Sequence, residues 1–337
     1  MEKFDWKNLP FGYIKADYNV RCYYRDGKWG EIEISSSEYI MLHIAATSLH
    51  YGQEIFEGLK AYRGRDGKIR LFRCRDNAQR MINSADYIKM AAPPVDLFVE
   101  AVKKTVRLNE HLVPPYESGA TLYVRPLLIG SGAQIGVKPA DEYLFIVFVT
   151  PVGPYFKTGF KPVTVIITRD SDRAAPLGTG HVKCGGNYAA SLPAAFEAQK
   201  LGYATCLYLD AKEKKYIDEF GPANFFGVKN NTYITPKSQS ILPSITNRSL
   251  ITLAEDFGMK IERRPVEVSE LETFEETGSC GTAAVITPIG KIFDPQNNKT
   301  YDYGNEAGPV SAKLYNRLRA IQYGDEHDTH NWIEFVD

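Results

Sequence analysis

Residues 151–162 are the part of the sequence that most limits how the chain can fold. This segment, PVGPYFKTGFKP, contains three prolines and two glycines, which interrupt both helices and strands. The chain has 337 residues, which is long enough for two domains. We therefore expect a smaller N-terminal domain over residues 1–150, a linker over residues 151–162 and a larger C-terminal domain over residues 163–337.

Helix and strand patterns occur on both sides of this linker. Residues 68–72 alternate polar and apolar side chains, as a half-buried strand does, whereas residues 76–91 and 96–109 have helical spacing. Residues 189–201 form an alanine-rich helical run, and Asn230-Asn231 separates two β-prone runs as a hairpin turn would. Because the order is not a strict strand–helix–strand repeat, the sequence indicates an α/β fold of the mixed α+β kind.

The charge balance and the cysteines exclude several classes of protein. Lys and Arg number 40 and Asp and Glu number 41, so no global basic field attracts nucleic acid or an anionic membrane. No apolar run approaches the roughly 18 residues of a membrane helix, and the N-terminus has no apolar signal core. The five cysteines form no CxxC motif, which favours a reducing compartment. We expect a cytoplasmic protein with no metal and with no nucleic-acid or membrane partner.

Lys183 lies in the most unusual segment of the chain, GTGHVKCGG at residues 178–186, where four glycines frame it. Glycine allows the backbone to approach another group closely. A lysine held in such a loop can lose its water, which favours the neutral amine that attacks an aldehyde. The alternative for this segment alone is a solvated turn with a surface lysine.

Two further segments are candidate anion sites. Thr246 can cap a helix that begins near Asn247, and the turn at residues 242–245 then leaves backbone N–H groups at a positive helix end. The small-residue loop at residues 278–284, GSCGTAA, can form a nest of backbone N–H groups. Taken singly, the first can be a plain cap and the second a tight turn.

Arg80 and Glu219 are two charged residues that can bind a ligand with a phosphate and a protonated ring nitrogen. Arg80 lies in the predicted helix at residues 76–91 and can face a phosphate, or it can lie on the polar face. Glu219 ends a predicted strand and can face a protonated ring nitrogen, or it can be a surface turn residue. Together with Lys183 and the anion sites, these residues supply what pyridoxal phosphate requires.

The combination of Lys183, Glu219 and Thr282 resembles the signature of class IV (fold type IV) pyridoxal-phosphate enzymes. Residues 49–62, LHYGQEIFEGLKAY, and residues 122–126, LYVRP, resemble the branched-chain amino acid aminotransferases within that class. The resemblance implies a two-domain fold with pyridoxal 5'-phosphate in the interdomain cleft, and a homodimer. It also implies reversible transfer of the amino group between L-leucine, L-isoleucine or L-valine and 2-oxoglutarate.

The resemblance assigns a role to each matching residue. Lys183 would form the Schiff base and move protons at the substrate Cα, and Glu219 would pair with the pyridine nitrogen. Further cofactor contacts would come from Tyr188 to the ring hydroxyl oxygen and, to the phosphate, from Arg80, Ile245, Thr246 and Thr282. The substrate side chain would contact Tyr51, Phe56, Tyr123 and Tyr155, and the carboxylates would contact Arg125, Thr282 and Ala283.

The sequence departs from the family pattern at two places. Animal relatives carry a redox-active CxxC where this chain has Ala284 and Thr287, so we expect that switch to be absent. Pro222 stands where some relatives have a hydroxyl residue near the cofactor.

Three alternative functions stay open. A D-amino-acid aminotransferase and an aminodeoxychorismate lyase share this fold, but residues 51–56 and 123–126 count against both. A non-catalytic dimer that binds a phosphorylated metabolite would not need Lys183 together with Glu219.

Overall fold

The computed structural model describes residues 4–155 and 159–336, which divide into two compact units. The first unit consists of Met1–Lys157, Val182–Gly185 and Ala320–Asp337, and the second of Thr158–His181 and Gly186–Arg319. The units therefore do not follow the single boundary that we expected, because the segment with Lys183 and the C-terminal residues group with the first unit, which is the larger. In the expected linker, residues 151 and 152 end a strand, and residues 156–158 lie outside the described residues.

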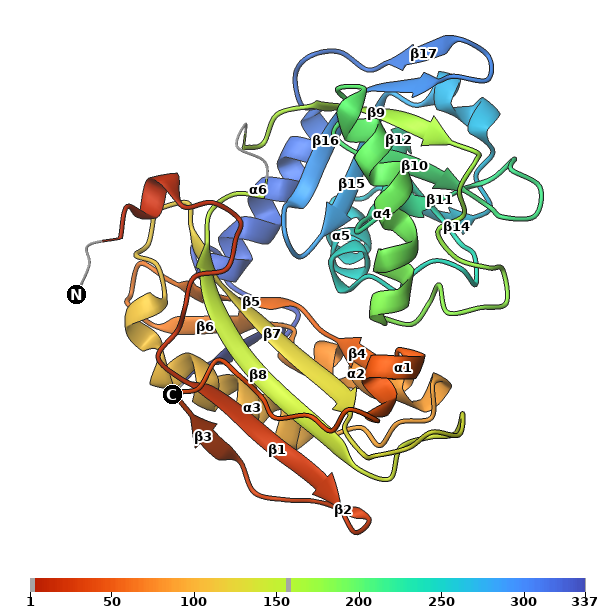
Figure 1. Cartoon of the computed structure of the whole chain (residues 1–337). Helices are drawn as coiled ribbons and strands as arrows, with labels where there is room; N and C mark the ends of the chain where they lie inside the picture. Colours follow the sequence, from red (N-terminus) through yellow and green to blue (C-terminus); the bar gives the residue numbers. More distant parts are fainter. Residues whose placement is uncertain (1–3, 156–158, 337) are drawn as a thin grey trace. The chain divides into compact units, whose positions relative to one another are not determined.

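The first unit is built on a nine-stranded sheet in which the described strand pairs are antiparallel (Figure 1). The strands are β1 (Asn19–Arg25), β2 (Lys28–Trp29), β3 (Glu33–Ser35), β4 (Glu54–Phe56), β5 (Leu59–Arg63), β6 (Ile69–Phe72), β7 (Thr121–Gly130), β8 (Tyr143–Val152) and β18 (Ile333–Phe335). Their order is β18-β6-β5-β7-β8-β1-β2, with β3 beside β1 and β4 beside β7. Strand β7 thus lies between β5 and β8 and also pairs with β4, which places the LYVRP segment at the centre of the sheet.

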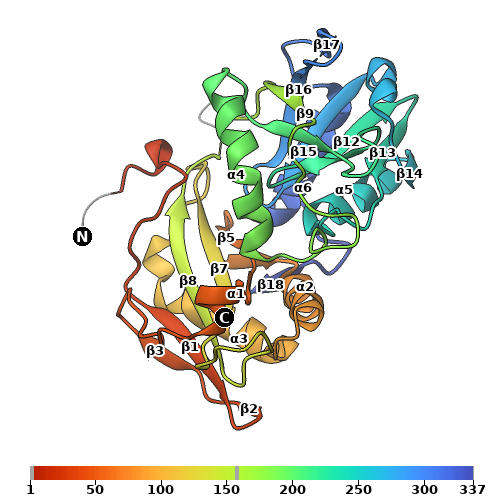
Figure 2. The same ribbon diagram turned by 45° about the vertical axis from the view of Figure 1, so that its right-hand side comes forward.

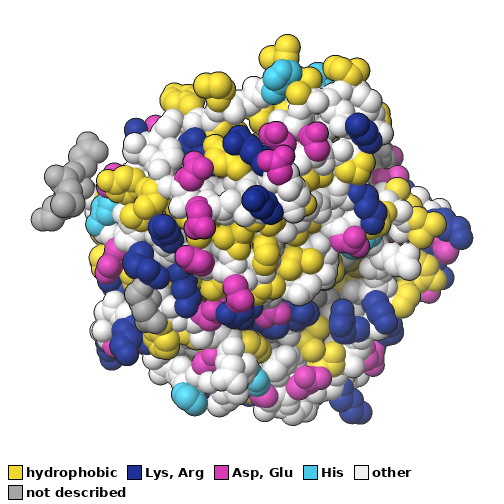
Figure 3. Space-filling model, turned by 90° about the horizontal axis from the view of Figure 1, so that it is seen from below, with side chains coloured by type: hydrophobic (Ala, Val, Ile, Leu, Met, Phe, Trp, Pro, Cys, Tyr) yellow, Lys and Arg dark blue, Asp and Glu magenta, His cyan; other side chains and the backbone are white. Residues whose placement is uncertain are grey.

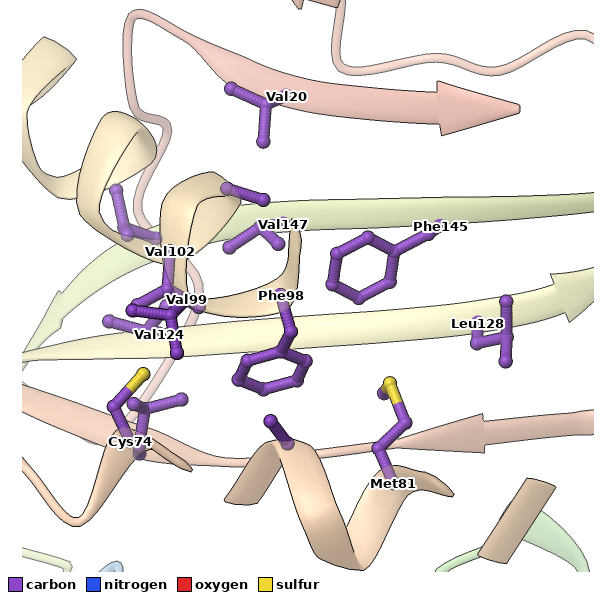
Figure 4. Close-up of a cluster of buried hydrophobic side chains, with 14 of the residues drawn as sticks. Val20, Cys74, Met81, Phe98, Val99, Val102, Val124, Leu128, Phe145 and Val147 are labelled. Atoms are coloured by element: carbon purple, nitrogen blue, oxygen red, sulfur yellow. The ribbon is translucent and has the colours of Figure 1, made fainter. Parts of the chain in front are cut away.

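Helices cover this sheet and close its core. The helices of this unit are α1 (Thr47–Tyr51), α2 (Cys74–Tyr87), α3 (Val95–Leu108) and the 3-10 turns η1 (Trp6–Asn8) and η2 (Glu110–Leu112). Helices α2 and α3 match the two helices expected from apolar spacing, although α2 ends earlier, at Tyr87. Phe98 of α3 stacks on Phe145 of β8 with ring centroids 5.7 Å apart, and Met81 of α2 joins the same core (Figure 4).

The second unit contains another nine-stranded sheet. Its strands are β9 (Val163–Thr168), β10 (Cys206–Leu209), β11 (Ile217–Phe220), β12 (Asn224–Lys229), β13 (Thr232–Pro236), β14 (Lys260–Arg264), β15 (Glu276–Gly281), β16 (Val285–Asp294) and β17 (Lys299–Asp302). The order is β11-β10-β9-β16-β15-β12-β13-β14, and β11 also pairs with β12, so six strands close into a ring. Figure 2 shows β12, β13 and β14 beside one another. The predicted hairpin at Asn230-Asn231 is confirmed, because both residues have positive φ angles and join β12 to β13.

The remaining helices are α4, α5, α6 and one 3-10 turn. Their bounds are α4 (Gly185–Lys200), α5 (Ile245–Asp256), α6 (Pro309–Tyr323) and η3 (Val268–Thr273). Helix α5 packs on β14 and β15 through its apolar side, including Leu250 and Leu253, both fully buried. Its first turn is thereby held on the strands of the second unit.

The surface has no single-sign field on the face seen in Figure 3, where basic and acidic side chains are interspersed. This agrees with the net charge of −1. Within residues 4–155 and 159–336, no helix has the length and apolar character needed to cross a membrane. The same residues contain no group of three or more His, Cys, Asp or Glu side chains placed to hold a metal ion.

Candidate functional site

Lys183 is held in the first unit by the residues on either side of it. Val182 and Cys184 are 1% and 6% exposed and belong to the core of this unit, whereas Lys183 between them is half-buried. The Lys183 carbonyl accepts a hydrogen bond from the Phe56 N–H at 3.1 Å, and its own N–H donates to Ser84 Oγ at 3.2 Å. The lysine backbone is therefore fixed on both sides before any ligand binds.

Phe56 brings two cations of the first unit together. The Lys183 Nζ lies 4.8 Å from the centre of the Phe56 ring, and the Arg125 guanidinium carbon lies 4.7 Å from it. Cations at this range are attracted by the negative face of an aromatic ring. Arg125 also lies 5.4 Å from the ring of Tyr123, its neighbour on the same face of β7. Thus four of the residues expected at the substrate and cofactor form one cluster: Phe56, Tyr123, Arg125 and Lys183.

Tyr123 is positioned by a glycine and by an aromatic residue that the sequence did not reveal. A Cβ atom on Gly58 would lie 2.0 Å from the Tyr123 hydroxyl oxygen, so only glycine leaves room for it. The Phe11 ring lies 5.6 Å from the Tyr123 ring and 5.1 Å from the Tyr155 ring, edge to face in both cases. Phe11 therefore links two of the predicted wall residues. No local pattern around residue 11 signals this role, because it depends on contacts with distant segments.

Tyr51 has a different environment from these aromatic residues. It ends α1, is 41% exposed, and its hydroxyl donates a hydrogen bond to the Ile135 carbonyl. These contacts do not by themselves place Tyr51 at the Phe56 ring.

Arg80 is a partly buried, paired arginine rather than a solvated one. It lies in α2, and its Nε and Nη2 donate to the two oxygens of Glu57 at 2.8 and 2.7 Å. Glu57 is 0% exposed, so this bidentate pair is strong and well fixed. The pairing orients the guanidinium, and Glu57 is a second residue that sequence reasoning missed, although it lies in the LHYGQEIFEGLKAY motif.

Glu219 is buried in the second unit, where three groups bind its carboxylate. Asn224 Nδ2 donates to Oε2 at 2.7 Å, the Leu242 N–H donates to Oε1 at 2.9 Å, and Arg173 forms an ion pair with Oε1. Burial raises the pKa of Glu219 to about 7, although the charge of Arg173 and both hydrogen bonds act to lower it. Arg173 was not among the predicted site residues, and its sequence surroundings carry no signal for this contact.

A chain of buried amides joins Glu219 to the start of α5. Asn224 Oδ1 accepts a hydrogen bond from Asn247 Nδ2 at 3.1 Å, and Asn247 Oδ1 accepts one from the Tyr233 hydroxyl at 2.8 Å. Asn247 lies in the first turn of α5, so the carboxylate and this helix end are held in one network. Fully satisfied networks of this kind rigidify a protein interior.

The cap of α5 is Ser244, which corrects the expectation that Thr246 is the cap. Ser244 Oγ accepts a hydrogen bond from the Asn247 N–H at 3.1 Å, and the helix begins at Ile245. Ile245 and Thr246 are therefore the first two helical residues. The N–H groups of a first turn have no acceptor within the helix, so this end suits an anion.

The predicted loop with Thr282 and Ala283 is a tight connection between β15 and β16. Gly281 pairs with Val285, which leaves residues 282–284 as the loop. Val285 has a φ of +66°, which is rare for a β-branched residue. Tyr188 lies in the first turn of α4 and is half-buried. In the second unit the predicted residues thus lie on a hairpin loop, a strand end and two helix starts.

Known proteins resemble the chain across both units. The family model of amino-transferase class IV matches residues 54–292. The branched-chain-amino-acid aminotransferase of Haemophilus influenzae is 49% identical, and the match covers 100% of both chains. The Escherichia coli branched-chain amino acid aminotransferase structure has a TM-score of 0.81 at 27% identity, over 96% of this chain and 100% of that one. The branched-chain amino acid aminotransferase of Thermobaculum terrenum, solved in its PLP form (holo form), has a TM-score of 0.79 at 26% identity, over 96% of this chain and 99% of that one.

Proposed function

The chain belongs to the class IV aminotransferase family, and from this premise we propose that it is a branched-chain-amino-acid aminotransferase. The reaction is the reversible transfer of the amino group between L-leucine, L-isoleucine or L-valine and 2-oxoglutarate. The observation that carries the proposal is the cluster around Phe56, where an amine and a guanidinium share one aromatic ring. An aromatic wall suits a branched apolar side chain, and an arginine beside it suits a carboxylate.

The donor groups fit pyridoxal phosphate as the cofactor. Lys183 provides an amine for the aldehyde carbon, and Glu219 provides a buried carboxylate for a protonated ring nitrogen. The first turn of α5, at Ile245 and Thr246, provides N–H groups for a phosphate. A similar protein, the Thermobaculum terrenum enzyme, has been solved in its PLP form. When bound, the cofactor supplies the electron sink for breaking a bond at the substrate Cα.

The protein side chains then bind, orient and move protons. Lys183 Nζ would carry the proton from the substrate Cα to the cofactor carbon that retains the amino group, and would carry a proton the opposite way in the second half-reaction. Arg173 and Asn224 keep Glu219 oriented, and this carboxylate favours the protonated ring nitrogen. Tyr188 contacts the ring hydroxyl oxygen.

Phosphate and substrate are held by further groups. Arg80, held by Glu57, and Thr282 add to the phosphate site, and the backbone at residues 282–283 receives the substrate carboxylate. Phe56, Tyr123 and Tyr155 contact the apolar side chain, and Arg125 receives the second carboxylate of glutamate. Tyr51 completes the wall, and its exposure suits a role in the site of a second copy of the chain.

We also propose that the protein is a cytoplasmic homodimer. Helix α4 exposes two large apolar side chains, Leu192 and Phe196, at 66% and 58%, and Leu201, one residue past the end of the helix, is 67% exposed. Such exposure along one helix favours a protein interface over solvent. The five cysteines are all unpaired and buried, which suits a reducing compartment. Light scattering of the purified protein tests the dimer, and a monomeric mass at micromolar concentration would contradict it.

The deciding experiment measures glutamate formation from L-leucine and 2-oxoglutarate, with D-alanine as the parallel donor. We expect glutamate from L-leucine only. Glutamate from D-alanine only would replace the proposed substrate class while retaining the cofactor. The variant Lys183→Ala should lose the reaction by at least about 10⁴-fold, because Lys183 is the group proposed to act at the substrate Cα. It should also lose covalent attachment of the cofactor after borohydride reduction, measured by mass. The exposed Lys299→Ala serves as the matched control and should keep both properties.

A further inference from the structure

Strand β4 presents a carboxylate beside the proposed substrate cluster. Along Glu54–Phe56 the side chains alternate, with Ile55 fully buried in the core of the first unit and its two neighbours half-buried. Residues two apart on a strand share a face, so Glu54 lies on the same face as Phe56. Phe56 is the ring that carries both the Arg125 and the Lys183 cations. Glu54 is therefore an anion next to two cations, and neither the cofactor nor the reaction as proposed uses it.

The position of Glu54 is fixed by the segment that carries Lys183. Its Oε1 accepts a hydrogen bond from the Gly185 N–H at 2.5 Å. A Cβ atom on residue 185 would lie 2.2 Å from that oxygen, so glycine is needed for the carboxylate to approach. The contact joins residues 131 positions apart in the sequence. Only Oε1 accepts the Gly185 hydrogen bond, so Oε2 can interact with a neighbouring positive charge.

A negative charge near Arg125 would compensate its guanidinium. Its Nε is buried and has no hydrogen-bond acceptor among the described residues. The guanidinium lies against the Phe56 and Tyr123 rings, and its Nη2 donates to the Tyr123 hydroxyl at 3.5 Å. A guanidinium against apolar side chains costs free energy unless a counter-charge compensates it. Burial raises the pKa of Glu54, whereas the Gly185 N–H and the positive charge of Arg125 act to lower it. Both side chains lie at Phe56, since Arg125 lies over its ring and Glu54 lies on the same face of β4, so the two charges belong to one cluster.

We propose that Glu54 is a specificity-determining residue that serves as the counter-charge of Arg125. This inference rests on the proposed function, in which one site must accept both a branched apolar side chain and the second carboxylate of glutamate. With an apolar substrate, Glu54 compensates Arg125, so the arginine can lie beside a hydrocarbon side chain. With a dicarboxylate substrate, the incoming anion and Glu54 compete for the same guanidinium. Glu54 therefore shifts the preference of the site from dicarboxylates toward branched apolar substrates.

The variant Glu54→Gln isolates the charge. Glutamine retains an oxygen that can accept the Gly185 hydrogen bond, so the Lys183 segment keeps its support. The variant Glu54→Ala removes both the charge and the acceptor. Glu110→Gln is the matched control, because Glu110 is an exposed carboxylate of the first unit whose ion pair with Arg63 lies on the surface.

The experiment measures the Kd of two inhibitors for the enzyme loaded with pyridoxal phosphate. Glutarate carries the second carboxylate, and 4-methylpentanoate carries the branched apolar group. In Glu54→Gln we expect glutarate to bind about tenfold more tightly relative to 4-methylpentanoate, which corresponds to about 1.4 kcal/mol. The KM for 2-oxoglutarate should fall relative to that for L-leucine, with a smaller change in kcat. Glu110→Gln should leave the ratio of the two Kd values unchanged.

The outcomes separate this proposal from the proposed function. If the wild-type enzyme makes glutamate from L-leucine but Glu54→Gln keeps the wild-type Kd ratio, the counter-charge role is wrong. An equal loss of affinity for both inhibitors in Glu54→Gln would also overturn it, because it would show that Glu54 only supports the Lys183 segment. A wild-type enzyme that makes no glutamate from L-leucine would overturn the proposed function and this proposal with it.

Discussion

The ion pair between Arg173 and Glu219 gives the most direct test of how the second unit holds its buried carboxylate. Both side chains are almost fully buried, at 6% and 3% exposure. Arg173 also donates through Nη2 to the carbonyl oxygens of Gly180 and Ser240, at 2.7 and 2.9 Å. One arginine thus neutralises Glu219 and ties together two loops. The perturbation is Arg173→Met, which keeps much of the side-chain volume but removes the charge.

The expected loss of unfolding free energy in Arg173→Met follows from the burial of Glu219. In the intact pair, burial already raises its pKa from the ordinary value of 4.5 to about 7. Keeping it ionised above pH 7 thus costs roughly 3 kcal/mol of unfolding free energy. Without Arg173 the carboxylate has no counter-charge, and breaking a buried pair in this way costs about 3–5 kcal/mol. The double variant Arg173→Met/Glu219→Gln should lose much less than the sum of the two single variants, because no charge is left unpaired.

Unfolding in urea at pH 8, without cofactor, measures these losses. The three tryptophans, Trp6, Trp29 and Trp332, all lie in the first unit, so their fluorescence reports on that unit. Far-UV circular dichroism reports on both units. We expect the variants to lower the midpoint of the circular dichroism change more than that of the fluorescence change. If the loss of unfolding free energy in the double variant equals the sum of the two single losses, the ion pair does not have the proposed role. An unchanged urea midpoint in Arg173→Met would also refute it.

The pH dependence supplies an independent check with a definite sign. Because the folded-state pKa of Glu219 lies above its ordinary value, the folded protein holds this proton more tightly than the unfolded chain does. The contribution to stability is complete below about pH 4.5 and is lost as the pH rises to about 7. Relative to Glu219→Gln, the wild-type unfolding free energy should therefore fall across this window. In Arg173→Met the fall should continue above pH 7, because the pKa rises further.

Two further predictions concern residues that position the site. Gly58→Ala places a Cβ 2.0 Å from the Tyr123 hydroxyl oxygen, so kcat/KM for L-leucine should fall at least about tenfold, a loss of roughly 1.4 kcal/mol in transition-state binding. Adding Tyr123→Phe should restore part of it, and an unchanged kcat/KM in Gly58→Ala would contradict the clash. Ser244→Ala removes the acceptor of the Asn247 N–H and should lower the unfolding free energy by about 1 kcal/mol in urea. Ser244→Thr keeps a hydroxyl and should lose less, so equal losses in both variants would argue against the cap.

The sequence alone was enough to predict the family, the fold class and much of the local structure. The family signature depends on residue types at given spacings, and the match to the class IV model confirms it. The hairpin at Asn230-Asn231 was predictable because asparagine tolerates positive φ, which this turn requires. The helix α3 was predictable from its apolar spacing, since one face had to meet a core. Each of these features is decided within a few neighbouring residues.

The partners of the site residues were not predictable in this way. Arg173 binds Glu219, Glu57 binds Arg80, and Phe11 lies between Tyr123 and Tyr155, yet no spacing in the sequence links them. Such contacts depend on how strands and helices are brought together. Several residues of the right type compete for each role, and only packing selects one. Thr246 illustrates the limit, because Ser244 two residues earlier also carries a capping hydroxyl and is the residue used.

Lys183 shows most clearly what the sequence determines and what only the tertiary structure determines. Its chemical role was a prediction from the sequence, because glycines on both sides of a single lysine allow a closely held amine and the family resemblance assigns it the Schiff base. Its place in the fold was decided by tertiary structure, since Val182 and Cys184 are buried in the core of the first unit although the flanking segments belong to the second. Burial of these two neighbours orients the lysine toward Phe56. Residue type sets what a side chain can do chemically, and long-range burial decides which groups it meets.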